Sequence, residues 1–222
     1  MTTQSATPAG SLNEQIRETL RQRRAQAPKE VLEVLQRASD QLAQSNLGSQ
    51  FLKEGGLAPD FTLPNARSVP VRLGDLLRRG PVVVSFYRGA WCPYCNLELR
   101  ALQAALPQIR SLGAALVAIS PQTPDHSLST AEKNALEFEV LSDVGNRVAR
   151  EYGLVFTLPQ ELRPVYQTWG IDLPKHNGDT SFELPVPATY IVGADRIIRL
   201  AFADLDYTRR LEPATIIAAL SA

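Results

Sequence analysis

Apolar residues follow helical spacing at the start of the chain. After Ser11, which forms a capping-box pattern with Glu14, they recur every four positions until a proline interrupts them. A second amphipathic stretch then ends near Gly48. We therefore predict two helices over residues 11–48, preceded by a disordered tail over residues 1–10. Two helices cannot bury a core alone, so we expect them to pack on the rest of the chain or across a homodimer, and we favour association.

Residues 50–222 alternate between strand and helix patterns. Short β-branched and aromatic runs are typical of buried strands. They predict strands over residues 82–87, 114–120, 139–141, 188–192 and 197–202, the last two forming a hairpin. Helical spacing predicts helices over residues 93–112, over 125–134, up to Tyr152, and over 213–220. Strands joined by helices and followed by a hairpin predict an α/β domain with a central mixed sheet flanked by helices.

A proline-rich segment between Leu158 and Pro187 fits neither pattern. Its aromatic residues Tyr166, Trp169 and Phe182 are too apolar for a free linker. Two interpretations stay open, namely a surface loop packed on its own aromatic side chains, or a lid or wall over an active site.

Composition excludes several classes of protein. The 222 residues carry 23 basic and 23 acidic side chains, so the chain offers no broad electrostatic surface for nucleic acid or an anionic membrane. No apolar run approaches the roughly 18–20 residues that span a bilayer, and the start of the chain lacks the apolar core of a secretory signal. We expect a cytoplasmic protein that binds neither nucleic acid nor membrane.

The only two cysteines lie three residues apart, between a predicted strand and a predicted helix. If the helix begins after Cys92, Pro93 takes the first helical position, where its missing N–H has no cost. Cys92 then faces free backbone N–H groups and the positive end of the helix dipole, which favour the thiolate. Cys95 lies one turn inside the helix on the same side. We predict that a partly exposed Cys92 is the attacking sulfur and that Cys95 resolves it as a disulfide.

Other uses of the two cysteines have less support. A zinc site needs further ligands, and His126 and His176 lack ligand spacing, so we expect them on the surface or in loops and expect no metal. An inert structural pair would not require a helix start beside it. A Cys–His hydrolase stays open, although a second cysteine so close would invite inactivating oxidation.

Three segments carry a family resemblance. Leu57–Pro64, FYRGAWCPYC and Pro187–Ala188–Thr189–Tyr190 together resemble the CxxC-containing, peroxiredoxin-like branch of the alkyl hydroperoxide reductase C and thiol-specific antioxidant (AhpC/TSA) group. This group belongs to the thioredoxin superfamily. The resemblance implies a thioredoxin-like fold over residues 50–222, with the N-terminal helices as an extension. It also implies a thioredoxin-dependent peroxidase that reduces hydrogen peroxide and organic hydroperoxides.

The resemblance assigns roles to both cysteines. Cys92 corresponds to the peroxidatic cysteine, which becomes a sulfenic acid, and Cys95 to the resolving one, which forms a disulfide with it. A reductant of the thioredoxin or glutaredoxin/glutathione type restores the dithiol, and no cofactor is needed. Two rival functions stay open, a thiol–disulfide oxidoreductase acting on protein disulfides and a non-catalytic redox sensor.

The sequence also departs from the family pattern. Ser85 and Gly89 stand where peroxiredoxins have a proline and a Thr or Ser, and the usual arginine near Tyr190 is missing. Arg88 is our candidate for stabilising the thiolate and the peroxide oxygen in its place. The alternative is a surface arginine paired with an acid.

Neighbouring residues receive structural roles. We expect Trp91 to form a wall of the site, Tyr94 to be exposed and Glu98 to be solvated on the helix. Pro187 matches the cis-proline that lies beside the CxxC motif in thioredoxins, so we expect it to help form the site.

Overall fold

The structure is a computed structural model that describes residues 10–222. The disordered tail predicted over residues 1–10 therefore lies outside the described residues, apart from Gly10. Within residues 10–222, no helix combines the length and the apolar character that a membrane crossing requires.

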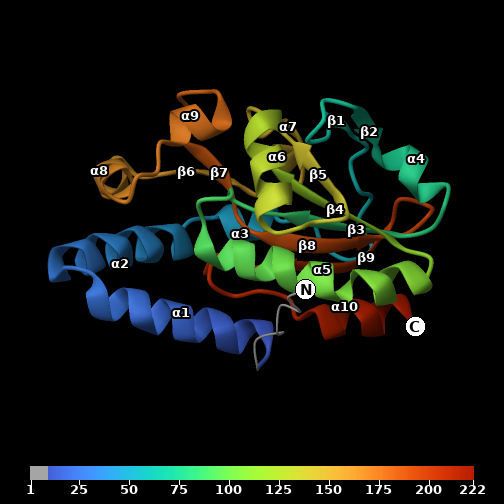
Figure 1. The fold of residues 1–222 in the computed structure, drawn as a ribbon, viewed down its shortest axis with the longest axis horizontal. Coiled ribbons are helices and arrows are strands. Elements are labelled where there is room, and N and C mark those ends of the chain that lie inside the picture. The colour runs from blue at the N-terminus through green and yellow to red at the C-terminus, as the bar shows by residue number, and fades with distance from the viewer. Residues whose placement is uncertain (1–9) are drawn as a thin grey trace, which may run out of the picture.

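Three helices open the chain, and strands and helices follow one another after them (Figure 1). The strands are β1 (Thr62–Pro64), β2 (Pro70–Arg72), β3 (Val82–Phe86), β4 (Ala115–Ser120), β5 (Glu139–Ser142), β6 (Val155–Thr157), β7 (Glu183–Pro185), β8 (Ala188–Val192) and β9 (Ile198–Ala203). The helices of the first half are α1 (Leu12–Gln26), α2 (Lys29–Ala43), α3 (Leu47–Gln50), α4 (Leu73–Leu77) and α5 (Pro93–Ser111). Those of the second half are α6 (Pro124–Lys133), α7 (Arg147–Glu151), the 3₁₀ helix η1 (Gln160–Leu162), α8 (Arg163–Thr168), α9 (Leu173–Asn177) and α10 (Pro213–Leu220).

A five-stranded mixed sheet forms the centre of the domain. Its strand order is β5-β4-β3-β8-β9, with β3, β4 and β5 parallel to one another and β8 antiparallel to both β3 and β9. Helices cover both faces of this sheet (Figure 1). The predicted α/β class, the central mixed sheet and the β8–β9 hairpin are therefore confirmed.

The central strand β3 is buried on both faces, which explains why four of its five residues, all but Ser85, are apolar. Val82, Val84 and Phe86 pack with α4, α7 and α3 on one face. Val83, with Tyr87 just beyond the strand, packs on the other face against α5, α1 and α10. Successive side chains of a strand point to opposite faces of the sheet, and both faces are buried here. The sequence of β3 therefore lacks the regular alternation of apolar and polar residues that a half-exposed strand shows.

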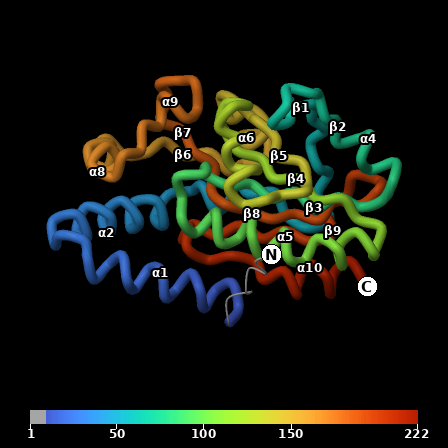
Figure 2. The backbone as a smooth tube through the Cα atoms, viewed as in Figure 1, coloured from blue at the N-terminus to red at the C-terminus, as the bar shows by residue number. Residues whose placement is uncertain are grey.

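The N-terminal helices form a hairpin that extends beyond the sheet (Figure 2). The Ser11–Glu14 capping box is present, and Leu12 and Ile16 are buried in the cluster that α5 and α10 share. Farther along, Ala38 of α2 packs with Leu162. The hairpin thus packs on its own chain, while the homodimer stays a prediction.

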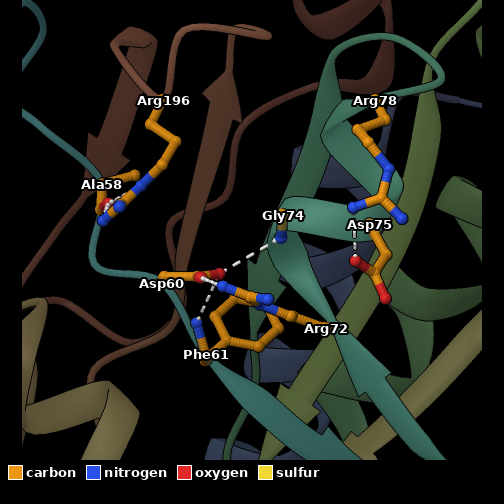
Figure 3. Close-up of polar contacts among 8 residues, drawn as sticks. All are labelled: Ala58, Asp60, Phe61, Arg72, Gly74, Asp75, Arg78 and Arg196. Carbon is orange, nitrogen blue, oxygen red and sulfur yellow. Dashed lines mark hydrogen bonds and ion pairs between the residues drawn. The ribbon is translucent and has the colours of Figure 1, made fainter.

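The segment Leu57–Pro64 is fastened by Asp60 (Figure 3). The Asp60 carboxylate accepts hydrogen bonds from Arg72 at 2.9 Å and from the Gly74 N–H at 3.1 Å, and Arg196 donates to the Ala58 carbonyl at 2.6 Å. These contacts tie β1 to β2, α4 and the β8–β9 turn.

The proline-rich segment folds into η1, α8, α9 and β7. Its buried residues Leu158, Leu162, Tyr166, Leu173 and Leu184 make a third cluster with α2. The surface-loop interpretation did not include these short helices, because a five- or six-residue helix shows little periodicity.

Candidate active site

The loop between β3 and α5 carries the CxxC motif. Cys92 is the N-cap of α5 and Pro93 the first helical residue, as predicted. Gly89 has φ +150°, and a Cβ there would lie 2.4 Å from the Trp91 Nε1 atom. Gly89, which stands where peroxiredoxins have a Thr or Ser, is therefore required by the backbone conformation of this turn. Beyond the turn, Gln122 accepts a hydrogen bond from the Ala90 N–H at 2.7 Å.

Cys92 is more deeply buried than predicted, with 1% of its surface exposed. The expected partial exposure is therefore wrong, although Cys92 does line a cavity. Burial raises the pKa of its thiol, but the hydrogen bond from Cys95 and the charges of Arg88 and Arg210 outweigh it and lower the pKa to about 6. Near neutral pH this sulfur is a thiolate.

Cys95 has the opposite character. It is fully buried inside α5. Burial raises its pKa well above the ordinary value, and so do its hydrogen bond with Cys92 and the charge there. Cys95 is therefore a thiol that donates to the neighbouring thiolate. Both cysteines are free.

Arg88 lies in an aromatic box. Its guanidinium carbon is 4.5 Å from the ring centre of Tyr207, 5.0 Å from Trp91 and 5.9 Å from Tyr166, whose hydroxyl accepts a hydrogen bond from it. Arg88 is buried and forms no ion pair among residues 10–222, and its buried Nε atom lacks a hydrogen-bond partner there. The alternative of a surface arginine paired with an acid is therefore wrong.

A second buried arginine was missed by the sequence analysis. Arg210 donates a hydrogen bond from Nη2 to the Cys95 sulfur at 3.6 Å and from Nε to Glu98 at 2.6 Å. The expected solvation of Glu98 is wrong, because this side chain is buried under the C-terminal segment. Burial raises the pKa of Glu98 to about 7, although Arg210 lowers it. Glu98 lies three residues after Cys95 on α5, a helical spacing that indicates proximity, but no local signal marks Arg210.

A cavity of about 940 Å³ opens in front of Cys92. Its walls come from α1, α2, the CxxC loop, α8 and the segment before Arg210, and they include Leu20, Leu32, Leu35, Trp91, Tyr94, Tyr166, Trp169 and Tyr207. Trp91 therefore stands where it was predicted, and Tyr166 and Trp169 favour the wall interpretation of the proline-rich segment. Tyr94 was expected to be exposed, but it is 6% exposed because it packs against Tyr207.

Pro187 follows a trans peptide bond, since residues 10–222 contain no cis peptide bond. The predicted cis-proline is therefore wrong. The Val186 N–H bonds to the Leu154 carbonyl at 2.8 Å, and Ala188 pairs with Phe86, so the chain continues extended from β7 into β8. Pro187 is buried beside the end of β3. Its contribution to the site stays a prediction.

The two histidines meet although 50 residues separate them. The ring centres of His126 and His176 are 4.6 Å apart, and both side chains are partly buried. Burial and the neighbouring His126 lower the pKa of His176. Within the described part of the chain, no group of three or more potential ligands surrounds a metal position.

Comparisons with known proteins agree with this geometry. The chain is 34% identical over 103 residues to a putative peroxiredoxin of the Bcp type from Buchnera aphidicola, covering 46% of this chain and 65% of that protein. It is 32% identical over 117 residues to a putative peroxiredoxin of Mycobacterium tuberculosis, covering 53% and 76%. The crystal structure of peroxidoxin BcpB from Mycobacterium tuberculosis superposes with a TM-score of 0.61 at 24% identity, covering 77% of this chain and 97% of that one.

The superposition shows the thioredoxin fold of peroxiredoxins, as the CxxC segment implied. Residues 55–201 match the model of the AhpC/TSA family. That match includes both cysteines, Arg88 and the central sheet except the last two residues of β9, so this chain belongs to the AhpC/TSA family.

Proposed function

We propose that this protein is a thiol-dependent peroxidase that reduces hydrogen peroxide and organic hydroperoxides. The observation that carries the proposal is the lowered pKa of Cys92, about 6, at a sulfur that lines a cavity. A thiolate is the form that attacks peroxides. The relatives named peroxiredoxin support the same activity.

The first step oxidises Cys92. Its thiolate attacks one peroxide oxygen, an S–O bond forms, and the O–O bond breaks. The distal oxygen leaves with the electron pair and takes a proton, giving water or an alcohol, while Cys92 becomes a sulfenic acid. Arg88 stabilises the attacking thiolate, and because its side chain lines the cavity in front of Cys92, we assign it the stabilisation of the peroxide oxygen as well.

The second step joins the two sulfurs. Cys95 attacks the sulfenic sulfur, an S–S bond forms, and the hydroxyl leaves as water with the proton of the Cys95 thiol. The hydrogen bond between the side chains shows that the two sulfurs are already neighbours. A disulfide formed at once protects Cys92 from irreversible oxidation. These steps use only sulfur, oxygen and protons, so the scheme needs no cofactor.

An external thiol then restores the dithiol. We propose a donor of the thioredoxin or glutaredoxin/glutathione type, which supplies two electrons by thiol–disulfide exchange. A cycle of this kind requires a reducing compartment, which supports a cytoplasmic location.

Variants of the two sulfurs test the proposal. We expect Cys92→Ser to abolish consumption of hydrogen peroxide and cumene hydroperoxide. Cys95→Ser should react once and then accumulate sulfenic acid, which a dimedone adduct reveals by mass. Ser111→Ala, at an exposed position at the far end of α5, is the control. Wild-type turnover by Cys92→Ser would overturn the proposal, and faster turnover of insulin disulfides than of either peroxide would favour the thiol–disulfide oxidoreductase instead.

A further inference from the structure

Each of the two sulfurs has its own buried arginine. Arg88 acts on Cys92, and Arg210 lies against Cys95 at 3.6 Å. The first arginine is explained by the peroxide step. The charge of Arg210 also lowers the pKa of Cys92, but its hydrogen bond goes to a sulfur that never meets the peroxide, and the proposed peroxide step does not explain that contact.

The donors of Arg210 are distributed over distinct partners. Nε donates to Glu98 at 2.6 Å, and Nη1 donates to the backbone carbonyls of Tyr207 and Arg209. Nη2 donates to the Cys95 sulfur. Two of the three guanidinium nitrogens are thus held by three oxygens, and the third nitrogen meets sulfur.

The backbone of Arg210 is fixed as well. Asn13 of α1 accepts a hydrogen bond from the Arg210 N–H at 3.2 Å and donates to its carbonyl at 2.9 Å. The Glu212 carboxylate accepts hydrogen bonds from the N–H groups of Leu12 at 3.1 Å and Asn13 at 2.8 Å. The N-terminal extension therefore holds the segment that carries Arg210.

A purely structural role explains this arrangement poorly. Arg210 is 3% exposed, and burying an ion pair gains little stability over apolar residues of similar volume. An apolar pair would fasten the C-terminal segment to α5 equally well. Neither the ion pair with Glu98 nor the charge effect on Cys92 requires a hydrogen bond to the Cys95 sulfur, and this bond gains strength when negative charge develops on that sulfur.

We propose that Arg210 is a catalytic residue for reopening the disulfide, where it stabilises Cys95 as the leaving thiolate, and that Glu98 is its positioning residue. This inference rests on the proposed function in one respect, namely that Cys92 and Cys95 form a disulfide.

The step balances as thiol–disulfide exchange. A donor thiolate bonds to the Cys92 sulfur, the Cys92–Cys95 bond breaks, and the electron pair passes to the Cys95 sulfur beside Arg210. The second thiol of the donor then attacks the mixed disulfide and displaces Cys92. The donor is oxidised to its disulfide by two electrons, and the protein returns to the dithiol.

The test measures reduction of the preformed disulfide. The disulfide is made with diamide, so that peroxidase activity is not needed, and its formation is checked by mass. Dithiothreitol then reduces it while the fluorescence of Trp91, beside Cys92, is followed by stopped flow. A second measurement equilibrates each variant against oxidised and reduced dithiothreitol.

We expect Arg210→Met to slow the reduction about tenfold or more, because hydrogen bonds to charged groups are the strong ones. The equilibrium constant should also shift toward the disulfide, because Arg210 lowers the pKa of Cys92 and so stabilises the thiolate that the reduced protein holds. A tenfold shift corresponds to about 30 mV more negative for a two-electron couple. Arg210→Lys keeps the positive charge and should recover part of the rate of reduction and part of the shift in the equilibrium constant. Arg209→Met is the matched control, since that neighbouring side chain is exposed and pairs with Asp204.

A structural role gives a different result. It would lower the thermal stability of Arg210→Met but leave the rate and the equilibrium at wild-type values, which would overturn the inference. If Arg210→Met does not fold, Glu98→Gln/Arg210→Met removes both charges, and a wild-type rate in that variant overturns the inference equally. Failure of the wild type to form the disulfide would instead refute the proposed function.

Discussion

At the scale of the residue, the two cysteines are chemically unequal although one helical turn separates them. Cys92 is the N-cap of α5 and has two arginine charges nearby. Cys95 lies inside the helix and donates a hydrogen bond to the Cys92 sulfur. The same burial acts on both sulfurs, so the direction of each pKa shift depends on hydrogen bonds and charge. The role of attacking sulfur therefore belongs to Cys92.

The reactivity of Cys92 should depend on pH accordingly. Its folded pKa of about 6 lies below the ordinary value of 9.0, so the thiolate persists above pH 6 and is lost as the pH falls through that value. At pH 5 about a tenth should remain. We expect the rate of alkylation by iodoacetamide in Cys95→Ser, which keeps a hydroxyl donor, to rise to a plateau with a midpoint near pH 6. A midpoint at pH 8 or above would contradict this assignment.

Arg88 should affect both the thiolate and the peroxide. We expect Arg88→Met to lower the rate of Cys92 oxidation by hydrogen peroxide about tenfold or more at pH 7. Arg88→Lys should fall between, since an ammonium lacks the planar fork of guanidinium. Arg110→Met removes an exposed arginine from α5 and serves as control. Stopped-flow rates at pH 9 test the contact of Arg88 with the peroxide, because Cys92 is then ionised in the variant as well. An oxidation rate of Arg88→Met that stays below the wild-type rate at pH 9 therefore reports the loss of this contact. An unchanged rate at both pH values would contradict the role of Arg88.

At the scale of the element, strong periodicity made the fold predictable. The runs that became β3, β4, β8, β9, α5 and α10 were recognised because each is long enough to show its pattern. The strands β1 and β2 were missed because three residues do not establish a strand period, and α4 was missed because five residues make little more than one helical turn.

The site was predictable only where its residues are neighbours in sequence. Cys92, Cys95, Arg88 and Trp91 share one loop and helix start, so local reasoning placed them together. Glu98 had a usable signal in its helical spacing from Cys95. Arg210 meets Cys95 across 115 residues, a contact that only the folded packing of the C-terminal segment on α5 creates.

One turn joins the N-terminal extension to the domain and carries a stability prediction. Gly153 has φ +72°, and a Cβ there would lie 2.1 Å from the Gln50 carbonyl oxygen. Gly113 has φ +76° with nothing within 4 Å of its Cβ position. We expect Gly113→Ala to lower the free energy of unfolding by about 1–2 kcal/mol, the cost of left-handed backbone. Gly153→Ala should lower the free energy of unfolding by about 2 kcal/mol more, because its Cβ also clashes with the Gln50 carbonyl oxygen. Urea unfolding measures both, and equal losses would show that Gln50 moves aside freely.

At the scale of the whole molecule, the cavity belongs to no single element. The N-terminal hairpin, the CxxC loop, α8 and the C-terminal segment each supply a wall, and they come from distant parts of the sequence. A volume of about 940 Å³ greatly exceeds what hydrogen peroxide needs, since a water molecule occupies about 30 Å³ in the liquid. The cavity is large enough for an organic hydroperoxide.

Narrowing this cavity should separate peroxides by size. Leu32 of α2 lines it, and Leu32→Trp adds bulk to that wall without touching the sulfurs. We expect oxidation of Cys92 by cumene hydroperoxide to slow about tenfold, because a pocket that is too small excludes the larger substrate. Oxidation by hydrogen peroxide should stay within about twofold of wild type, since the small molecule still passes. Leu128→Trp makes the same change at an exposed position of α6, outside the cavity, and should alter neither rate. Equal slowing of both peroxides by Leu32→Trp would show that the substitution disturbs Cys92 itself, and no slowing of either would show that organic hydroperoxides reach the sulfur by another path.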